Sequence, residues 1–271
     1  MDLENKRVLI TGASRGIGAA LADSFASAGA TVLLVARSKD AIAAKAERLE
    51  GKAYPADLTD LSTLGEFIDG VLASGPIDVL VNNAGVDHTD WVVCAPVDNL
   101  QHTITLNLVV PITLCRLVLP HMLQNENGGH VVNVSSMASS NPLPGMATYA
   151  ASKAGLSHFT AGLRADLDGL PVSTTLVELG TVATEMVENA RSYKPTQDAF
   201  ARLERLKLLP PDMTPEFVAD AVVAAVSKNR RHVRLPSRGS LFPMMTEGPR
   251  RMTELALRGV KAQPDYQGDA E

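Results

Sequence analysis

Short runs of β-branched residues alternate with longer Ala/Leu-rich helical patterns along most of this sequence. The alternation begins with a strand-like run at residues 7–11, a helical pattern at 17–28 closed by Gly29, and a second strand-like run at 31–35. β-branched residues favour strands, and two parallel strands need a crossover, usually a helix, to join them. The alternation therefore predicts an α/β fold, a doubly wound parallel sheet with helices on both faces.

The same pattern continues to about residue 235 and predicts about seven strands. Further strands are expected at residues 53–54, 77–81, 130–134, 172–177 and 232–235, and further helices at 41–49, 61–72, 100–124, 149–167 and 215–226, the last with Thr214 as its N-cap. Residues 182–209 are charged and helix-prone. No repeat, linker or change in composition precedes residue 236. We therefore expect one domain over residues 1–235 and a basic C-terminal extension, not a separate domain, over 236–271.

Composition and charge exclude several functional classes. The 271 residues are 45% hydrophobic and 20% charged, which suits a chain with a large core. The net charge of −5 and the 4% aromatic content argue against a nucleic-acid binder. The two cysteines lack metal-ligand spacing, so no metal is expected. The N-terminus is charged at once and shows no secretory signal, so we expect a cytoplasmic protein.

Two stretches raise the question of a membrane. Residues 104–123 are mostly apolar over the length of a bilayer span, but Asn107, Arg116 and two prolines interrupt them. We interpret them as a helix packed between the sheet and a neighbouring subunit. Residues 228–261 carry nine basic and two acidic side chains. The alternatives there are an amphipathic element that touches an anionic membrane surface and, as we prefer, packing on an acidic surface of the same chain or of a partner.

A glycine-rich turn, TGASRGIG at residues 11–18, joins the first strand to the first helix. Glycines let the backbone approach a pyrophosphate closely, and a helix N-terminus offers unpaired N–H groups with a positive dipole end. The spacing G-x-x-x-G-x-G differs from the G-x-G-x-x-G fingerprint and from a Walker loop. The turn predicts a dinucleotide phosphate site whose candidate residues are Gly12, Ser14, Arg15, Gly16, Ile17 and Gly18.

The end of the second strand indicates which dinucleotide binds. An acidic residue there binds the ribose hydroxyls of NAD, whereas an arginine accommodates the 2′-phosphate of NADP. This chain has Ala36 and Arg37, and Arg15 lies in the glycine turn. We therefore predict NADP(H); NAD(H) is the alternative if both arginines are solvated surface charges.

Tyr149 and Lys153 lie four residues apart in a predicted helix, so their side chains share one face. A neighbouring ammonium favours the phenolate, and we expect Lys153 to lower the pKa of Tyr149 toward the range useful for acid–base catalysis. Ser136 ends a strand 13 residues before Tyr149, the sequence NNAG at 82–85 ends another strand, and Asn107 lies in the helix that follows it.

In order and spacing, these motifs resemble the short-chain dehydrogenase/reductase family over residues 5–235. The resemblance implies a Rossmann-type domain and a catalytic tetrad of Asn107, Ser136, Tyr149 and Lys153. In such a tetrad Tyr149 exchanges a proton with the substrate oxygen, to which Ser136 hydrogen-bonds. Lys153 holds the nicotinamide ribose and lowers the pKa of Tyr149, and Asn107 positions a water.

The resemblance also implies further cofactor contacts and an assembly. The contacts are Asp57, Leu58, Asn83, Ala84, Gly85, Gly180, Val182 and Thr184, besides Tyr149 and Lys153. One departure is that Leu179-Gly180 stands where the family usually has Pro-Gly, which weakens the expectation for the backbone there. Two long helices pair across subunits in the family, so a homodimer or homotetramer is expected.

Together these features predict an NADP(H)-dependent oxidoreductase that interconverts a carbonyl and an alcohol. The candidate substrate walls are mostly apolar and favour a hydrophobic ketone, steroid-like or fatty compound; they comprise Val86, Met137, Leu143, Pro144, Met146 and residues 185–209. One alternative is a catalytically silent dinucleotide sensor or scaffold, although such proteins usually lose the Tyr/Lys pair. Another, an epimerase or dehydratase, needs a different glycine spacing and a larger C-terminal region.

Overall fold

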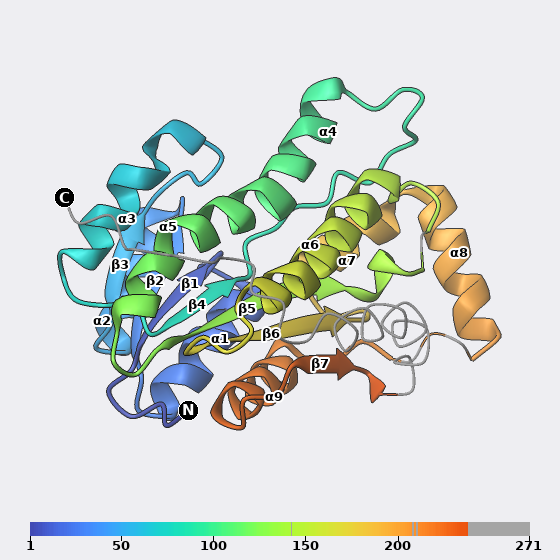
Figure 1. Ribbon diagram of the computed structural model, residues 1–271. Coiled ribbons are helices and arrows are strands. Elements are labelled where there is room, and N and C mark those ends of the chain that lie inside the picture. The colour runs from blue at the N-terminus through green and yellow to red at the C-terminus, as the bar shows by residue number, and fades with distance from the viewer. Residues whose placement is uncertain (142, 208, 210, 238–271) are drawn as a thin grey trace.

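Seven parallel strands form one sheet in the order β3-β2-β1-β4-β5-β6-β7, in the computed structural model of the chain (Figure 1). The strands are β1 Arg7–Thr11, β2 Thr31–Ala36, β3 Lys52–Pro55, β4 Val79–Asn82, β5 Gly129–Ser136, β6 Val172–Leu179 and β7 His232–Leu235. The structure describes residues 1–237 except 142, 208 and 210. The predicted doubly wound sheet is confirmed, whereas nearly all of the basic extension at 236–271 lies outside the described residues.

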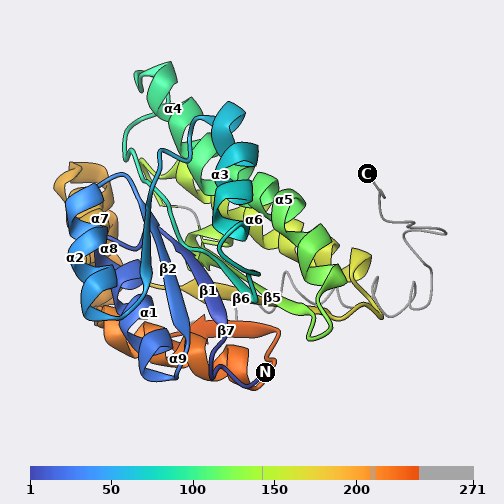
Figure 2. The same cartoon turned by 90° about the vertical axis from the view of Figure 1, so that its left-hand side faces the viewer.

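Helices cover both faces of the sheet (Figure 2). They are α1 Gly16–Ser27, α2 Lys39–Arg48, α3 Leu64–Leu72, α4 Val97–Ile104, α5 Val110–Gln124, α6 Ala147–Asp166, α7 Glu185–Ser192, α8 Lys194–Arg205 and α9 Pro215–Ser227. Side chains of α1, α2 and α9 form one apolar core on one face, and side chains of α3, α5 and α6 form a second core on the other. The sheet is buried on both faces, which explains why its strands are continuous apolar runs rather than alternating ones.

Local signals at helix ends agree with the expectations. Gly29 adopts a φ of +85° after α1, a conformation that glycine adopts without strain. Thr214 caps α9, because its hydroxyl accepts a hydrogen bond from the backbone N–H of Phe217 at 3.2 Å.

Several element boundaries differ from the expectations. The strand expected at 77–81 begins only at Val79, while β5 and β6 run on to Ser136 and Leu179. Polar residues at strand ends carry no apolar signal, but the β5–β6 ladder continues through them. The helix expected from residue 100 begins at Val97 and contains a π-helical turn, Thr105–Val109, between α4 and α5.

The apolar stretch that raised the membrane question is part of this helical run. Within the described residues, Val97–Gln124 is the one run long and apolar enough to cross a bilayer by length and composition. Its α5 portion buries Leu114, Val118 and Met122 in the second core, as expected of a helix packed on a sheet. The same packing explains its apolar composition.

Candidate active site

A cavity of about 800 Å³ lies beyond the carboxyl ends of the strands, at the point where the strand order reverses between β1 and β4. Ligands of doubly wound sheets bind at this switch point. Every cofactor residue predicted from the sequence lines the cavity, namely Gly12, Ser14, Arg15, Gly16, Ile17, Gly18, Arg37, Asp57, Leu58, Asn83, Ala84, Gly85, Tyr149, Lys153, Gly180, Val182 and Thr184. Of the predicted catalytic tetrad, Ser136, Tyr149 and Lys153 line it and Asn107 does not.

The backbone of the glycine turn lies so close to neighbouring backbone that side chains at Gly12 and Gly18 would clash with it. Gly12 has a φ of +68°, and a Cβ there would lie 2.9 Å from the Cα of Ala84. A Cβ on Gly18 would lie 2.1 Å from the carbonyl oxygen of Gly12. The turn therefore leaves bare backbone and the N-terminus of α1 facing the cavity, which suits a pyrophosphate.

Hydrogen bonds from the end of β1 hold the NNAG segment against the turn. The Thr11 hydroxyl accepts from the backbone N–H groups of Asn83 and Ala84, each at 3.0 Å, and donates to the Val81 carbonyl at 3.2 Å. The Asn83 side chain donates to the Thr11 carbonyl at 2.9 Å. These contacts join two neighbouring strands beside the cavity, so Asn83 and Ala84 support the site through the backbone as well as lining it.

Two arginines border the cavity in different settings. Arg37 is exposed, and its charge together with hydrogen bonds from Thr59 lowers the pKa of Asp57, the Thr59 bonds having the larger effect. Arg15 forms an ion pair with Glu185, the first residue of α7, with both side chains largely exposed. Sequence reasoning did not anticipate this pair, because the two residues are 170 positions apart.

Tyr149 and Lys153 share one face of α6, as their spacing predicted, with the Lys153 ammonium 5.8 Å from the centre of the Tyr149 ring. Lys153 Nζ donates to the Val134 carbonyl at 2.9 Å, and burial lowers the Lys153 pKa to about 8. Burial raises the pKa of Tyr149 to about 12, and the Ser136 hydroxyl opposes this rise. The expected lowering of the Tyr149 pKa by Lys153 is therefore wrong for the protein alone, because desolvation of the phenolate dominates.

Asn107 lies fully buried in the π-helical turn between α4 and α5. Its Oδ1 accepts from the Val86 N–H at 2.8 Å, while its Nδ2 donates to the Val86 carbonyl at 2.8 Å and to the Ser152 hydroxyl at 3.1 Å. A Cβ on Gly85 would lie 3.2 Å from Asn107 Oδ1 and 3.4 Å from Lys153 Nζ. Asn107 thus lies directly behind the cavity wall, and it connects the segment after β4 to α6.

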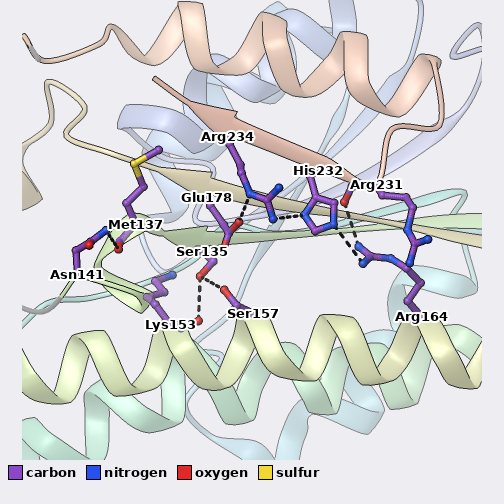
Figure 3. Close-up of polar contacts among 10 residues, drawn as sticks. All are labelled: Ser135, Met137, Asn141, Lys153, Ser157, Arg164, Glu178, Arg231, His232 and Arg234. Carbon is purple, nitrogen blue, oxygen red and sulfur yellow. Dashed lines mark hydrogen bonds and ion pairs between the residues drawn. The ribbon is translucent and has the colours of Figure 1, made fainter. Parts of the chain in front are cut away.

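The two neighbouring serines at the end of β5 have different surroundings, of which Figure 3 shows those of Ser135. The buried Ser135 hydroxyl donates to the Lys153 carbonyl at 2.9 Å and pairs with the Ser157 hydroxyl at 2.8 Å, which ties β5 to α6. The Ser136 hydroxyl accepts from the Ala138 N–H at 3.1 Å and is the one that affects the Tyr149 pKa. The geometry therefore favours Ser136, the residue selected by its spacing from Tyr149.

The departure from Pro-Gly coincides with a buried ion pair. Glu178, 2% exposed, accepts a hydrogen bond from Arg234 Nε of β7 at 2.7 Å, and Arg234 in turn contacts His232 at 3.1 Å (Figure 3). Gly180, two residues further along the chain, is tightly enclosed, since a Cβ there would lie 3.0 Å from Pro236 Cδ. Cross-strand contacts between β6 and β7 thus hold the backbone where the family's proline usually stands.

The predicted substrate walls are only partly found at the cavity. Val86 and residues 185–189 line it, whereas Met137, Leu143, Pro144 and Met146 do not. The structure adds polar lining residues that sequence reasoning missed, Asp87 and His102. His102 of α4 pairs with His88 at 3.0 Å between ring nitrogens. Neither residue belongs to a motif, so only the tertiary structure assigns them to the cavity.

The fold and the cavity define a dinucleotide-binding α/β protein of the Rossmann type. The short chain dehydrogenase family model matches residues 6–195, and the chain therefore belongs to the short-chain dehydrogenase/reductase family, whose members are oxidoreductases acting on small molecules.

The chain is similar to named relatives and to a solved structure. It is 33% identical over 238 residues to ketoacyl reductase HetN of Nostoc sp., covering 85% of this chain and 78% of HetN. It is 35% identical over 239 residues to 3-oxoacyl-[acyl-carrier-protein] reductase FabG of Thermotoga maritima, covering 86% and 95%. A short-chain dehydrogenase from Sphingobium yanoikuyae in complex with NADPH superimposes with a TM-score of 0.77 at 28% identity, covering 97% of this chain and all of the other.

Proposed function

We propose that this protein is an NADP(H)-dependent oxidoreductase that interconverts a carbonyl and an alcohol on a hydrophobic small molecule. The observation that carries the proposal is that Ser136, Tyr149 and Lys153 line the same cavity as the glycine turn. A cofactor held by that turn and a substrate beside Tyr149 would share one space. A bound nicotinamide dinucleotide supplies or accepts a hydride at the substrate carbon.

Residues of the chain would bind the cofactor and transfer the proton. Backbone groups of the glycine turn and the N-terminus of α1 would hold the pyrophosphate of the cofactor. Lys153, anchored through Val134, is placed to hold the nicotinamide ribose. During reduction Tyr149 donates its phenolic proton to the carbonyl oxygen, and Ser136 donates a hydrogen bond to that oxygen as negative charge develops there. A Tyr149 pKa of about 12 keeps the phenol protonated at neutral pH, which suits a proton donor.

The preference for NADP(H) over NAD(H) rests on Arg37 and Arg15. Both line the cavity, and Arg37 lies at the end of β2, where a 2′-phosphate would lie. Similarity to a structure that contains NADPH supports the same preference. Arg37→Asp should move the preference toward NADH. Arg230→Asp is the matched control, because Arg230 is exposed and does not line the cavity. If wild type and Arg37→Asp prefer NADPH over NADH to the same extent, the assignment of NADP(H) through Arg37 is refuted.

A fatty or ketoacyl-type ketone is the first substrate class to test, because two similar proteins are named as reductases of such compounds. A catalytically silent dinucleotide sensor on the same fold is less favoured, since Tyr149, Lys153 and Ser136 all line the cavity.

We also propose that the protein is cytoplasmic and forms a homodimer or homotetramer whose subunits pair through α5 and α6.

The decisive experiment measures NADPH oxidation with a panel of acyl, alkyl and aryl ketones. Tyr149→Phe should lower kcat by at least about 100-fold, the usual contribution of a general acid. Tyr54→Phe is the matched control, because the Tyr54 hydroxyl bonds Ser74 and does not line the cavity. Equal turnover in the wild type and Tyr149→Phe would exclude the proposed mechanism.

A further inference from the structure

The segment after β4 brings a carboxyl group into the cavity that Tyr149 lines. Asp87 is a lining residue and comes directly after Val86. The backbone of Val86 is held on both sides by Asn107, which accepts from its N–H and donates to its carbonyl, each at 2.8 Å. The position of Asp87 is therefore set by a fully buried side chain rather than by a free loop.

The two oxygens of the Asp87 carboxyl differ in their contacts, and neither is among the fully buried unpaired atoms of the described residues, so water can reach the one without a protein partner. Its Oδ2 accepts a hydrogen bond from the Thr89 hydroxyl at 2.8 Å. Within the described part of the chain, no hydrogen bond reaches Oδ1. Burial raises the Asp87 pKa, while the hydrogen bond from Thr89 and the charge of His88 act in the opposite direction. An acceptor that is partly removed from water and partly unpaired gains most from a donor on a bound molecule.

Asp87 and Tyr149 also interact electrostatically. The Asp87 charge adds to the rise in the Tyr149 pKa. Within the described residues, Ser136 of β5, whose hydroxyl lowers this pKa, and Lys153 of the same helix, 5.8 Å from the ring, also face Tyr149. Because both residues line one cavity, a substrate whose carbonyl lies at Tyr149 can extend to Asp87.

If the group next to the substrate carbonyl is purely hydrocarbon, it covers Asp87 Oδ1 but offers it no hydrogen bond. A site built to hydrogen-bond a substrate group discriminates strongly against analogues that lack the group, because its own polar atom is then left unpaired. We propose that Asp87 is a specificity-determining residue that selects carbonyl substrates bearing a hydrogen-bond donor, a hydroxyl or an ammonium, next to the reacting carbonyl. This inference rests on the proposed function and narrows its substrate class.

The test compares ketones that differ only at the neighbouring carbon: acetophenone, 2-hydroxy-1-phenylethanone and 2-amino-1-phenylethanone. kcat/KM for NADPH-dependent reduction is measured with wild type, Asp87→Asn, Asp87→Ala and the control Asp90→Asn. Asp90 is three residues along the same loop, does not line the cavity, and hydrogen-bonds the Trp91 N–H. Ratios between ketones are compared across variants, so differences in intrinsic ketone reactivity cancel.

Asp87→Ala should reduce the preference for the donor-bearing ketones over acetophenone by about 10-fold or more relative to wild type, as expected for losing a hydrogen bond to a charged group. Asp90→Asn should leave the ratio unchanged. A larger loss for the ammonium than for the hydroxyl would identify charge as the recognised feature. Equal losses for the two would identify the hydrogen bond alone.

A pH profile separates this role from a merely structural one. Removing the negative charge of Asp87 lowers the Tyr149 pKa, so the profile for oxidation of the matching alcohols with NADP⁺, which needs the phenolate, should move to lower pH in the near-isosteric Asp87→Asn. A ketone ratio that matches wild type in both Asp87→Asn and Asp87→Ala would overturn the inference, whatever the pH profile, and leave the proposed function standing. Absence of NADPH oxidation by wild type with every ketone of the wider panel would overturn the proposed function, and the inference with it.

Discussion

The buried ammonium of Lys153 predicts a substitution that stabilises the protein while removing a residue proposed for catalysis. Lys153 is 5% exposed, and burial lowers its pKa from an ordinary value of 10.5 to about 8. The folded state therefore disfavours the charged form, and a shift of this size corresponds to about 3 kcal/mol. Lys153→Met keeps an unbranched chain of similar length and removes that charge.

The loss of a hydrogen bond offsets part of the stability that Lys153→Met gains by removing the buried charge. The ammonium donates to the Val134 carbonyl at 2.9 Å, and bonds from charged donors contribute about 1.5–3 kcal/mol. Subtracting a bond at the lower end of that range leaves a net increase in the free energy of unfolding of about 1–2 kcal/mol for Lys153→Met at pH 7.

The pH dependence has a definite sign. Below pH 8 Lys153 is charged in both states, and the folded protein bears the full desolvation cost. Between about pH 8 and 10.5 the unfolded chain binds more protons at this site than the folded one, so wild-type stability rises with pH. The advantage of Lys153→Met is therefore largest at pH 7 and shrinks toward pH 10.

The assay is urea unfolding followed by far-UV circular dichroism at pH 7 and pH 10. The control is Lys39→Met, an exposed lysine at the start of α2. The reasoning would be refuted by a Lys153→Met protein less stable than wild type at pH 7, or by a difference that does not narrow at pH 10. The first result would mean that the ammonium stabilises the fold through Val134 by more than its burial costs, and the second that folding does not lower the pKa of Lys153.

Three further outcomes are expected. Gly18→Ala should abolish tight dinucleotide binding in a fluorescence titration, because the added Cβ would lie 2.1 Å from the Gly12 carbonyl oxygen; wild-type affinity would contradict the steric argument. Glu185→Gln frees Arg15 and should tighten NADPH binding about two- to fivefold without changing NADH binding, since an exposed ion pair contributes at most about 1 kcal/mol; an equal effect on both cofactors would exclude competition for Arg15. Thr11→Val leaves the Ala84 N–H without its partner, while the Asn83 N–H keeps the Val81 carbonyl, and should lower the free energy of unfolding by about 1–3 kcal/mol in a urea titration; a loss below about 0.5 kcal/mol would count against that reasoning.

Much of the site was predictable because its motifs are local. The glycine turn, the NNAG segment and the Tyr149/Lys153 pair each lie at the end of a strand or at the start of a helix, and the alternation of elements predicts that strand ends meet at one edge of the sheet. The structure accordingly brings every predicted cofactor residue to one cavity. The direction of the Tyr149 pKa shift was not predictable, because burial depends on the whole fold and outweighs one neighbouring charge.

The sequence by itself determined the α/β class, the order of the elements and the chemical groups at each strand end, because these depend on local propensity and short spacings. Only the tertiary structure decided which distant groups meet: Arg15 with Glu185, Glu178 with Arg234, and Asp87 with Tyr149 in one cavity. The physical reason is that these partners come from elements far apart in the chain. Strand order, register and the packing of α6 and α7 bring them together, and no local pattern encodes those contacts.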